Sequence, residues 1–536
     1  MTPAEAPVPV PVPVPLPLPL PLPPPPPPLP APAHSPPPPP PPAPTPLPDP
    51  RPSLAERLLD RLNPVLVREL RQGTRSRAFR VGHAFTLVAV AVVAVAIASL
   101  GDDLDQGQAF MIALGALWPV ILFVVPARAM GSASREMSAD LAEHVLLTRL
   151  GPGRIVSGHL QAAMAHILIT LSLFSPLLAL TYLLRGVDVQ GIALSLALAA
   201  SGGLATASGA VALGSLARYG RAAAAARVLG GVGIAFFALG SIGSGPSFFL
   251  LLGRGGLPAS ELLAALAGYA TALGFWVALA WLIARAALSH PFENRSTGFR
   301  VHALLMAAAC VGLVVAFAPA HSVAEGLAAS CAVAVLLAFP AAFFAATEED
   351  ALSPRVRCHV PRRGPLALLA APFLPGGGRG LVFAALLLAG LGAVELVGQQ
   401  GIATRLWMAN DERAIFMLGI LYAAFYLSAA RLLRGRLGRG ARPNWIARGG
   451  MVVFMLLGCV VPLVVEALAT GDIGRWHAGH VLNPFWTIAE AGRNPDEALG
   501  VLGLLAAAAV LLNVPAMATG VREVLDAAAA RRRGRA

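Results

Sequence analysis

Long hydrophobic runs separated by short polar segments fill the chain from about residue 82 to its C-terminal region. Twelve of these runs are long enough to cross about 30 Å of hydrocarbon as helices of about 20 residues. The pattern predicts an all-α integral membrane protein with about twelve transmembrane helices. The expected spans lie near residues 82–100, 108–127, 158–184, 190–216, 228–252, 257–284, 301–319, 323–346, 380–397, 414–430, 449–469 and 496–518.

Arginine residues are distributed unevenly between the loops that these spans define. When the N-terminus is placed in the cytoplasm and the spans alternate in direction, 34 Arg fall on the cytoplasmic side and 6 on the other side. Because cytoplasmic loops carry an excess of basic residues, we expect both termini in the cytoplasm. The composition is rich in Ala, Gly and Arg and contains no Lys, which is typical of a GC-rich bacterial genome. The predicted location is therefore the bacterial inner membrane.

Two long loops on the predicted cytoplasmic side divide the membrane region. They lie near residues 128–157 and 347–379, are each about thirty residues long, and both follow the second span of a group of six. This spacing favours two six-helix halves. The expected organisation is a proline-rich tail at 1–52, a first membrane half at 53–290, a second half at 291–520 and an Arg-rich cytoplasmic C-terminus at 521–536.

The N-terminal region differs in composition from the rest of the chain. Of 49 prolines, 28 fall within the first 50 residues. Such a segment favours polyproline II and cannot form a packed core, so a disordered tail is predicted. No Arg precedes Arg51 and proline interrupts the hydrophobic stretch, which disfavours a secretion signal. A docking segment for a partner, a spacer and a misplaced start codon all remain open.

Composition excludes several chemistries. The mean hydropathy of +0.69 disfavours a soluble enzyme. All 40 basic residues are Arg, so the usual Walker A loop and Schiff-base catalysis are excluded. The net charge of +12 is carried by Arg clusters between apolar segments with few aromatic residues, which indicates a membrane surface rather than nucleic acid. The four Cys are scattered, so neither disulfides nor a zinc site is expected, and no cofactor is predicted.

Two amphipathic segments precede the first span. The segment SLAERLLDRL at 53–62 opens with a capping box and has leucines at helical spacing. Asn63 and Pro64 then provide an N-cap and a first helical residue for a second helix, with Arg68 and Arg71 on its polar side. This helix is expected to lie in the membrane plane, near lipid phosphates. An ordinary juxtamembrane anchor would have the same pattern.

The first long loop contains a second amphipathic pattern. In REMSADLAEHVLLTRLGPGRIVSGHL at 135–160, Glu136, Asp140 and Glu143 form an acidic stripe, and apolar residues follow another face. Gly151 and Pro152 end this helix before the third span begins. A short helix of this kind between two spans suits the transmission of force from a cytoplasmic partner, although loop helices without a partner are also common.

These two motifs together resemble the permease subunit of a type-2 class ABC transporter of the export type. The resemblance rests on NPVLVREL at 63–70 and, more specifically, on the loop motif, which includes Ile155, Val156 and Gly158; Gly151 and His159 stand where Ser and Lys are usual. LNPFWTIAEA at 482–491 is similar to the short extracellular element before the last span of such permeases. The similarity covers residues 63–290 and, more faintly, 449–520. The resemblance implies a connecting helix with Asn63, Pro64, Arg68, Glu69 and Arg71, and contacts to the ATPase partner by Glu136, Asp140, Leu146, Leu147, Thr148, Leu150 and Pro152.

The resemblance implies a function without covalent chemistry in this chain. A separate ATPase subunit would hydrolyse ATP, and the permease would move a substrate, most simply outward. The expected partners are this ATPase subunit, membrane lipid, and either a second copy of the chain or a second permease chain. An integral-membrane enzyme and a non-transporting membrane scaffold remain the alternatives.

A few polar residues within the expected spans are further candidates. His159 and His166 share a face of the third span, and Glu395 and Glu466 are acids in apolar surroundings. Buried ionisable groups in spans often mark substrate or proton pathways. Hydrogen-bonded packing for the histidines and interfacial solvation for the acids are the competing interpretations. His477 and His480 have a spacing that a metal accepts, but no neighbouring ligand in the sequence completes a set.

Overall fold

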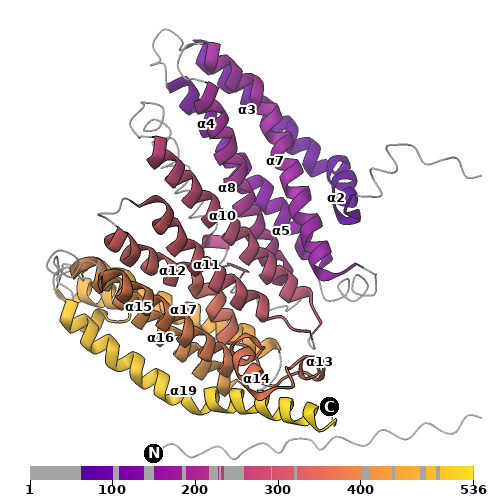
Figure 1. The fold of residues 1–536 in the computed structure, drawn as a ribbon. Coiled ribbons are helices and arrows are strands. Elements are labelled where there is room, and N and C mark those ends of the chain that lie inside the picture. The colour runs from indigo at the N-terminus through magenta and orange to yellow at the C-terminus, as the bar shows by residue number, and fades with distance from the viewer. Residues whose placement is uncertain are drawn as a thin grey trace, which may run out of the picture. The chain divides into compact units, whose positions relative to one another are not determined.

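A computed structural model describes most of the chain beyond its N-terminal tail. The predicted proline-rich tail at 1–52 and nearly all of the amphipathic segment predicted at 53–62 lie outside the described residues. All regular secondary structure in the described residues is helical, which confirms the predicted all-α fold (Figure 1). The described residues are 62–99, 108–137, 150–183, 189–216, 227–228, 231–233, 259–290, 293–318, 323–400, 410–437, 441–470, 478–490 and 495–534.

Ten helical segments in the described residues are long and apolar enough to cross a membrane. A bilayer core leaves backbone polar groups without water, so each spanning segment satisfies its own hydrogen bonds as a helix. These segments are α4–η1–α5 (Gln108–Pro119, Val120–Val124 and Val125–Glu136), α7 (Pro152–Leu183), α8 (Val189–Ser215), α10 (Ala259–Leu288), α11 (Thr297–Phe317), α12 (Val323–Ala346), α15 (Gly377–Gln400), α16 (Asn410–Arg436), α17 (Ala441–Thr470) and α19 (Pro495–Arg532).

The two remaining predicted spans have different outcomes. The first is observed as helix α3 (Arg77–Ser99), although its apolar part, Thr86–Ala96, is shorter than in the other spans. Most of the fifth predicted span, 228–252, lies outside the described residues. The structure therefore confirms ten of the predicted spans as apolar helices of spanning length, and it defines the chain as a multi-pass membrane protein.

Helix α2 (Pro64–Arg75) precedes α3 and packs against α7. It begins where the local sequence predicts, because the Asn63 side chain accepts a hydrogen bond from the Val65 backbone N–H at 3.1 Å and Pro64 occupies the first turn. Val65 is buried against the start of α7, whereas Arg71 is exposed. The polar and apolar sides of α2 are thus arranged as the amphipathic pattern indicated.

The second span contains a π-helical turn. Pro119 and Pro126 lie at either side of this turn, η1, and each removes a backbone donor from the helical ladder. The following helix, α5, lies close to α8 because α8 is rich in small residues. A Cβ atom built on Gly214 of α8 would lie 2.8 Å from the Met130 carbonyl oxygen and 2.9 Å from Ala133 Cβ. The small residues of α8 therefore serve close helix packing.

The helices from α11 onward, which we call the second half, are built around α12. Helix α11 packs along α12, which also contacts α15 and α16, and α19 lies along α16 and α15. Between α12 and α15 the chain forms two short helices and a 3-10 turn, namely α13 (Pro354–Arg357), α14 (Gly364–Ala370) and η3 (Ala371–Phe373). Before α19 it forms η4 (Ala478–His480) and α18 (Pro484–Glu490).

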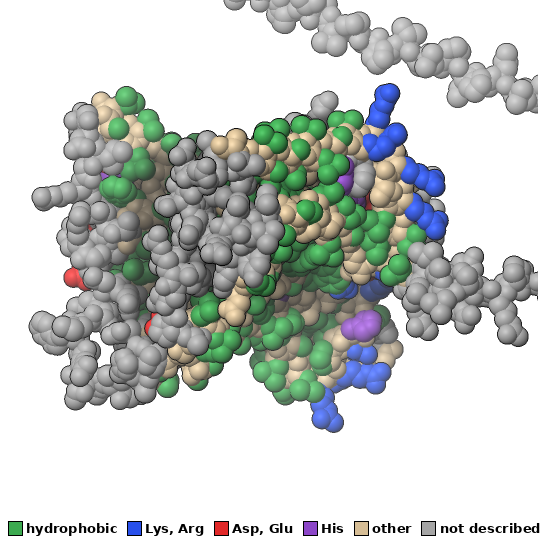
Figure 2. Space-filling model, turned by 90° about the horizontal axis from the view of Figure 1, so that it is seen from above, with side chains coloured by type: hydrophobic (Ala, Val, Ile, Leu, Met, Phe, Trp, Pro, Cys, Tyr) green, Lys and Arg blue, Asp and Glu red, His purple; other side chains and the backbone are tan. Residues whose placement is uncertain are grey.

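Helix α10 packs against both α8 and α11, and so connects the helices up to α10, which we call the first half, to the second half. Leu216 after α8, Ala287 of α10 and Trp445 of α17 are buried in one cluster. These residues lie at one end of the bundle, which we call the Arg-rich end. At this end α5, α8, α10, α12 and α16 finish, and α7, α15 and α17 begin. Figure 2 shows hydrophobic side chains over much of the visible described surface, with Arg side chains gathered toward one side. This distribution agrees with a membrane-embedded belt and a charged end.

Candidate functional site

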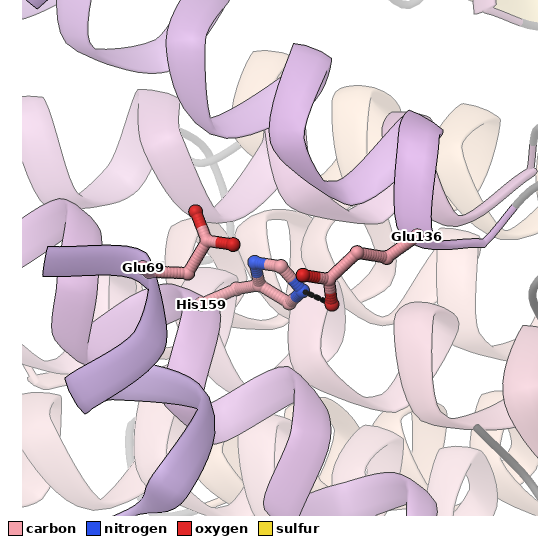
Figure 3. A group of neighbouring side chains, drawn as sticks. All are labelled: Glu69, Glu136 and His159. Atoms are coloured by element: carbon pink, nitrogen blue, oxygen red, sulfur yellow. Dashed lines mark hydrogen bonds and ion pairs between the residues drawn. The ribbon is translucent and has the colours of Figure 1, made fainter. Parts of the chain in front are cut away.

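Three polar side chains from three helices meet at the Arg-rich end of the first half. Glu69 comes from α2, Glu136 ends α5, and His159 lies in the second turn of α7 (Figure 3). His159 Nε2 lies 3.0 Å from Glu136 Oε2, and one oxygen or nitrogen from each of the three residues lies within 4.8 Å of the others. We call this group, together with Arg68, the α2 clamp.

Close backbone packing brings α2 to this position. Gly158 of α7 faces Val65 of α2, and a Cβ built on Gly158 would lie 2.5 Å from Val65 Cβ. The Asn63 amide also donates a hydrogen bond to the Arg154 carbonyl oxygen at 2.5 Å. The absence of a side chain at Gly158 therefore allows α2 to lie directly on the first turns of α7.

The charges in the α2 clamp compensate one another. Arg68 forms an ion pair with Glu136 and lies 3.7 Å from Glu69, and Ser132 of α5 donates a hydrogen bond to Glu69 at 2.6 Å. The His159 side chain is almost fully buried, and that of Glu136 is 17% exposed. A carboxylate with so little access to water needs charged or hydrogen-bonding partners, and Arg68 and His159 supply them.

One histidine and two carboxylates are a ligand set that divalent transition metals accept. In this structure, however, the Arg68 guanidinium already neutralises Glu136 from its exposed side. A metal ion would have to compete with this ion pair for the same carboxylate. The geometry therefore fits an electrostatic clamp between helices better than a metal centre.

The clamp joins the two helices, α5 and α7, that flank the loop that the sequence singled out. Glu136 lies two residues before the segment 138–149, and Leu150 directly follows it; Leu150 is half-buried against a core that includes Ile155 and Val156. Pro152 opens α7. The other predicted partner contacts, Asp140, Leu146, Leu147 and Thr148, lie outside the described residues. The structure thus joins the predicted connecting helix to the two helices that flank the predicted loop.

The other intraspan candidates have separate environments. His166 follows His159 by two helical turns on the same face of α7. It also faces α2, since its Nε2 is 3.2 Å from a Cβ built on Gly73. Its Nδ1 lies 2.7 Å from the Ala162 carbonyl oxygen. Glu395 of α15 is buried within the bundle, which differs from the solvated position weighed for it.

Glu466 belongs to a different site at the opposite end of the second half. It lies 2.8 Å from His480 Nε2, and His480 is fully buried. No carboxylate lies near His480 in the sequence, because its partner Glu466 is on α17, 14 residues earlier, and the two side chains meet only in the folded structure. His477, the second histidine of that pattern, lies outside the described residues.

A second charged network was not predicted at all. Arg379 at the start of α15 is fully buried and donates hydrogen bonds to the Gly520 carbonyl at 2.9 Å, the Asp350 carbonyl at 2.6 Å and the Glu523 carboxylate at 3.0 Å. Arg431 of α16 pairs with the Asp350 carboxylate. These contacts tie the end of α12 to α15, α16 and α19.

Arg300 extends this network to α11. It is fully buried, lies 3.8 Å from Glu348 and donates a hydrogen bond to the Gly376 carbonyl at 3.0 Å. Glu348 accepts a hydrogen bond from the Gly376 backbone N–H at 3.1 Å. The signal available in the sequence was the run Glu348, Glu349, Asp350 directly after an apolar span, because such acids need basic partners when helices pack around them.

Comparison of the chain with family models, curated proteins and solved structures gives no match. What the fold and the site define is a class: an all-α, multi-pass membrane protein with a charged helix clamp at one end.

Proposed function

We propose that this chain is the membrane-spanning permease subunit of an ABC transporter of the type-2 export class. The observation that carries the proposal is the α2 clamp, in which Glu69 and Arg68 of α2 meet Glu136 and His159. A permease driven by a separate motor needs a loop whose movement is passed to several helices at once. The clamp joins α2 to both helices that flank the loop 138–149.

The packing around the clamp supports transmission beyond these helices. Because packed interiors resist compression, a force on the loop displaces α5 and α7 with α2 rather than deforming one of them. Helix α5 is in close contact with α8 at Gly214, and α8 in turn packs against α10. This chain of contacts leads from the loop to the junction between the halves.

In this proposal the Arg-rich end faces the bacterial cytoplasm, with both termini there, and the bundle lies in the inner membrane. ATP is hydrolysed on a separate subunit, since the chain has no Lys for a Walker A loop. The transported substrate moves outward. A second copy or a second permease chain would complete the pathway if one chain does not form it alone.

The proposal is tested by purifying the tagged chain from native membranes and identifying proteins that copurify in fixed ratio. We expect an ATPase with Walker motifs. The double variant Leu147→Asp and Pro152→Ala should abolish this association, because it places a charge in the loop and alters the start of α7.

A matched control places the same charge elsewhere. Phe485 of α18 is 75% exposed, so Phe485→Asp adds an acid at the opposite end of the second half without disturbing a buried contact. This control should retain the ATPase. Recovery of the ATPase with both variants would contradict the assigned docking site. Recovery of no ATPase with the unmodified chain, even after crosslinking, would favour the membrane-enzyme or scaffold alternative.

A further inference from the structure

The segment 353–370, which contains α13 and α14, exposes apolar and basic side chains together. We call it the basic elbow; it lies beside the C-terminal part of α19 (Figure 1). Leu366, Leu368 and Leu369 of α14 are 49%, 52% and 71% exposed. Exposed leucines are expected on the long spans that meet lipid tails, but α14 has seven residues and is too short to span.

The basic elbow is held firmly against α19. Ala367 and Ala371 form one face with Val524 and Ala528 of α19, and Val356 belongs to the same core. Packing of this face turns the leucines of α14 to the outside. The exposed leucines are thus part of a folded surface.

Arginine surrounds these leucines. Four exposed arginines lie in the elbow, of which Arg355 is 3.9 Å from Glu293 and Arg357 is 3.1 Å from Glu523. Arg362 and Arg363 directly precede α14 and are also exposed. The Cβ position of Gly364 lies 3.5 Å from the Arg532 guanidinium of α19, which adds a further positive charge. The surface near the leucines therefore carries more arginines than carboxylates.

The elbow is also close to the place where spans leave the membrane. Six residues separate Ala370 from Gly377, the first residue of α15, so these positions are at most about 24 Å apart. Arg379, at the start of α15, forms hydrogen bonds with Asp350 and Glu523. Asp350 precedes the elbow in the chain, and Glu523 lies on α19 next to Val524, which the elbow contacts. Helix α14 therefore lies close to the end of a spanning helix, where lipid headgroups are expected.

We propose that the basic elbow binds anionic phospholipid headgroups at the membrane surface. Arg362 and Arg363 contact lipid phosphates, and Leu366 and Leu369 insert at the boundary between headgroups and acyl chains. Short amphipathic helices with basic residues and exposed leucines bind membrane interfaces by this combination. Complementary charge and the proximity of the span ends favour lipid over a protein partner. The inference does not depend on an ATPase partner.

The test places an environment-sensitive NBD fluorophore on the elbow of the full chain. The exposed Cys358 and the partly exposed Cys459 are replaced by Ser, and Leu369→Cys provides the labelling site. The protein is reconstituted into nanodiscs of phosphatidylcholine or of an equal mixture of phosphatidylcholine and phosphatidylglycerol. Quenching is measured with lipids that carry a nitroxide on the headgroup and with aqueous iodide.

Binding of anionic headgroups should increase nitroxide quenching about twofold in the mixed nanodiscs and decrease quenching by iodide. The variant Arg362→Gln with Arg363→Gln should lose this difference, whereas Arg362→Lys with Arg363→Lys should retain it. As a matched control, Arg77→Gln with Arg80→Gln removes two exposed charges from the start of α3, and this variant should keep the difference between the two nanodiscs.

Two outcomes would overturn the inference. Equal nitroxide quenching in both nanodiscs would mean that the elbow does not prefer anionic lipid. Full iodide access in both nanodiscs, combined with protection of the probe in native membranes, would mean that a protein covers the elbow instead.

Discussion

Val65 of α2 lies so close to Gly158 of α7 that any side chain at position 158 would collide with it. The Cβ of an alanine there would be 2.5 Å from Val65 Cβ and 2.9 Å from its Cγ1. Both atoms belong to a β-branched side chain with little freedom to move away. The contact therefore determines how closely α2 can approach the first turns of α7.

The substitution Gly158→Ala is expected to push α2 away from α7. Overpacking of a close helix contact costs about 1–3 kcal/mol. We expect a lower midpoint of thermal unfolding in detergent and faster hydrogen exchange in residues 64–75, with little change in α16. Gly131→Ala on α5 is the control, because a Cβ at that position meets no described atom within 4 Å. Equal exchange in α2 for both variants would contradict the packing argument.

Glu136 should be energetically coupled to Arg68. Glu136→Gln leaves Arg68 without its oppositely charged partner, and Arg68→Gln does the same to Glu136. Each variant is expected to lower the free energy of unfolding by about 1–3 kcal/mol. Because Arg68 is 42% exposed, the value should fall in the lower part of this range. The double variant should cost less than the sum, which a double-mutant cycle of unfolding midpoints measures.

Glu497→Gln on α19 provides the comparison for that cycle. Glu497 is exposed, so its substitution should change stability by less than about 0.5 kcal/mol and should be additive with Arg68→Gln. Strict additivity between positions 68 and 136 would instead mean that the ion pair does not stabilise the α2 clamp.

The clamp should be independent of divalent metal. Arg68 provides the positive charge that Glu136 needs, so chelation with EDTA should leave the unfolding midpoint unchanged. Added Zn²⁺ should raise the midpoint of the unmodified protein by no more than it raises the midpoint of His159→Gln. A stabilisation by Zn²⁺ that disappears in His159→Gln would assign Glu69, Glu136 and His159 as metal ligands. Arg68→Gln should be the variant most prone to such binding, because it frees the carboxylate.

Local sequence was sufficient for the ten spanning helices in the described residues and for the start of α2. Hydrophobic runs predict spans because a backbone in lipid has to be helical, and Asn63 with Pro64 predicts a helix start because both act within one turn. The pairing of Arg68 with Glu136 could not be predicted in this way, since it depends on how three helices pack. The loop motif nevertheless pointed to Glu136 as a candidate.

The buried position of Arg379 could not be predicted from the distribution of arginines between the loops. Counting arginines predicts which side of the membrane a loop occupies, and on that basis Arg379 is one of many surface charges. In the structure it is fully buried and contacts Pro375, Asp350, Gly520 and Glu523. Its partner Glu523 is 144 residues away, so no local pattern connects them.

The buried pair of Arg379 and Glu523 leads to the last prediction. Arg379→Met removes the guanidinium and takes one donor from Glu523 and from each of three backbone carbonyls, those of Asp350, Pro375 and Gly520. This loss should cost about 3–5 kcal/mol. Because Arg379 joins α15 to α19, the loss should appear first in the basic elbow, as faster proteolysis within 353–370. Arg436→Gln, an exposed charge at the end of α16, should leave both proteolysis and stability unchanged. Faster cleavage elsewhere, with an intact elbow, would show that Arg379 stabilises the bundle without fixing the elbow to α19.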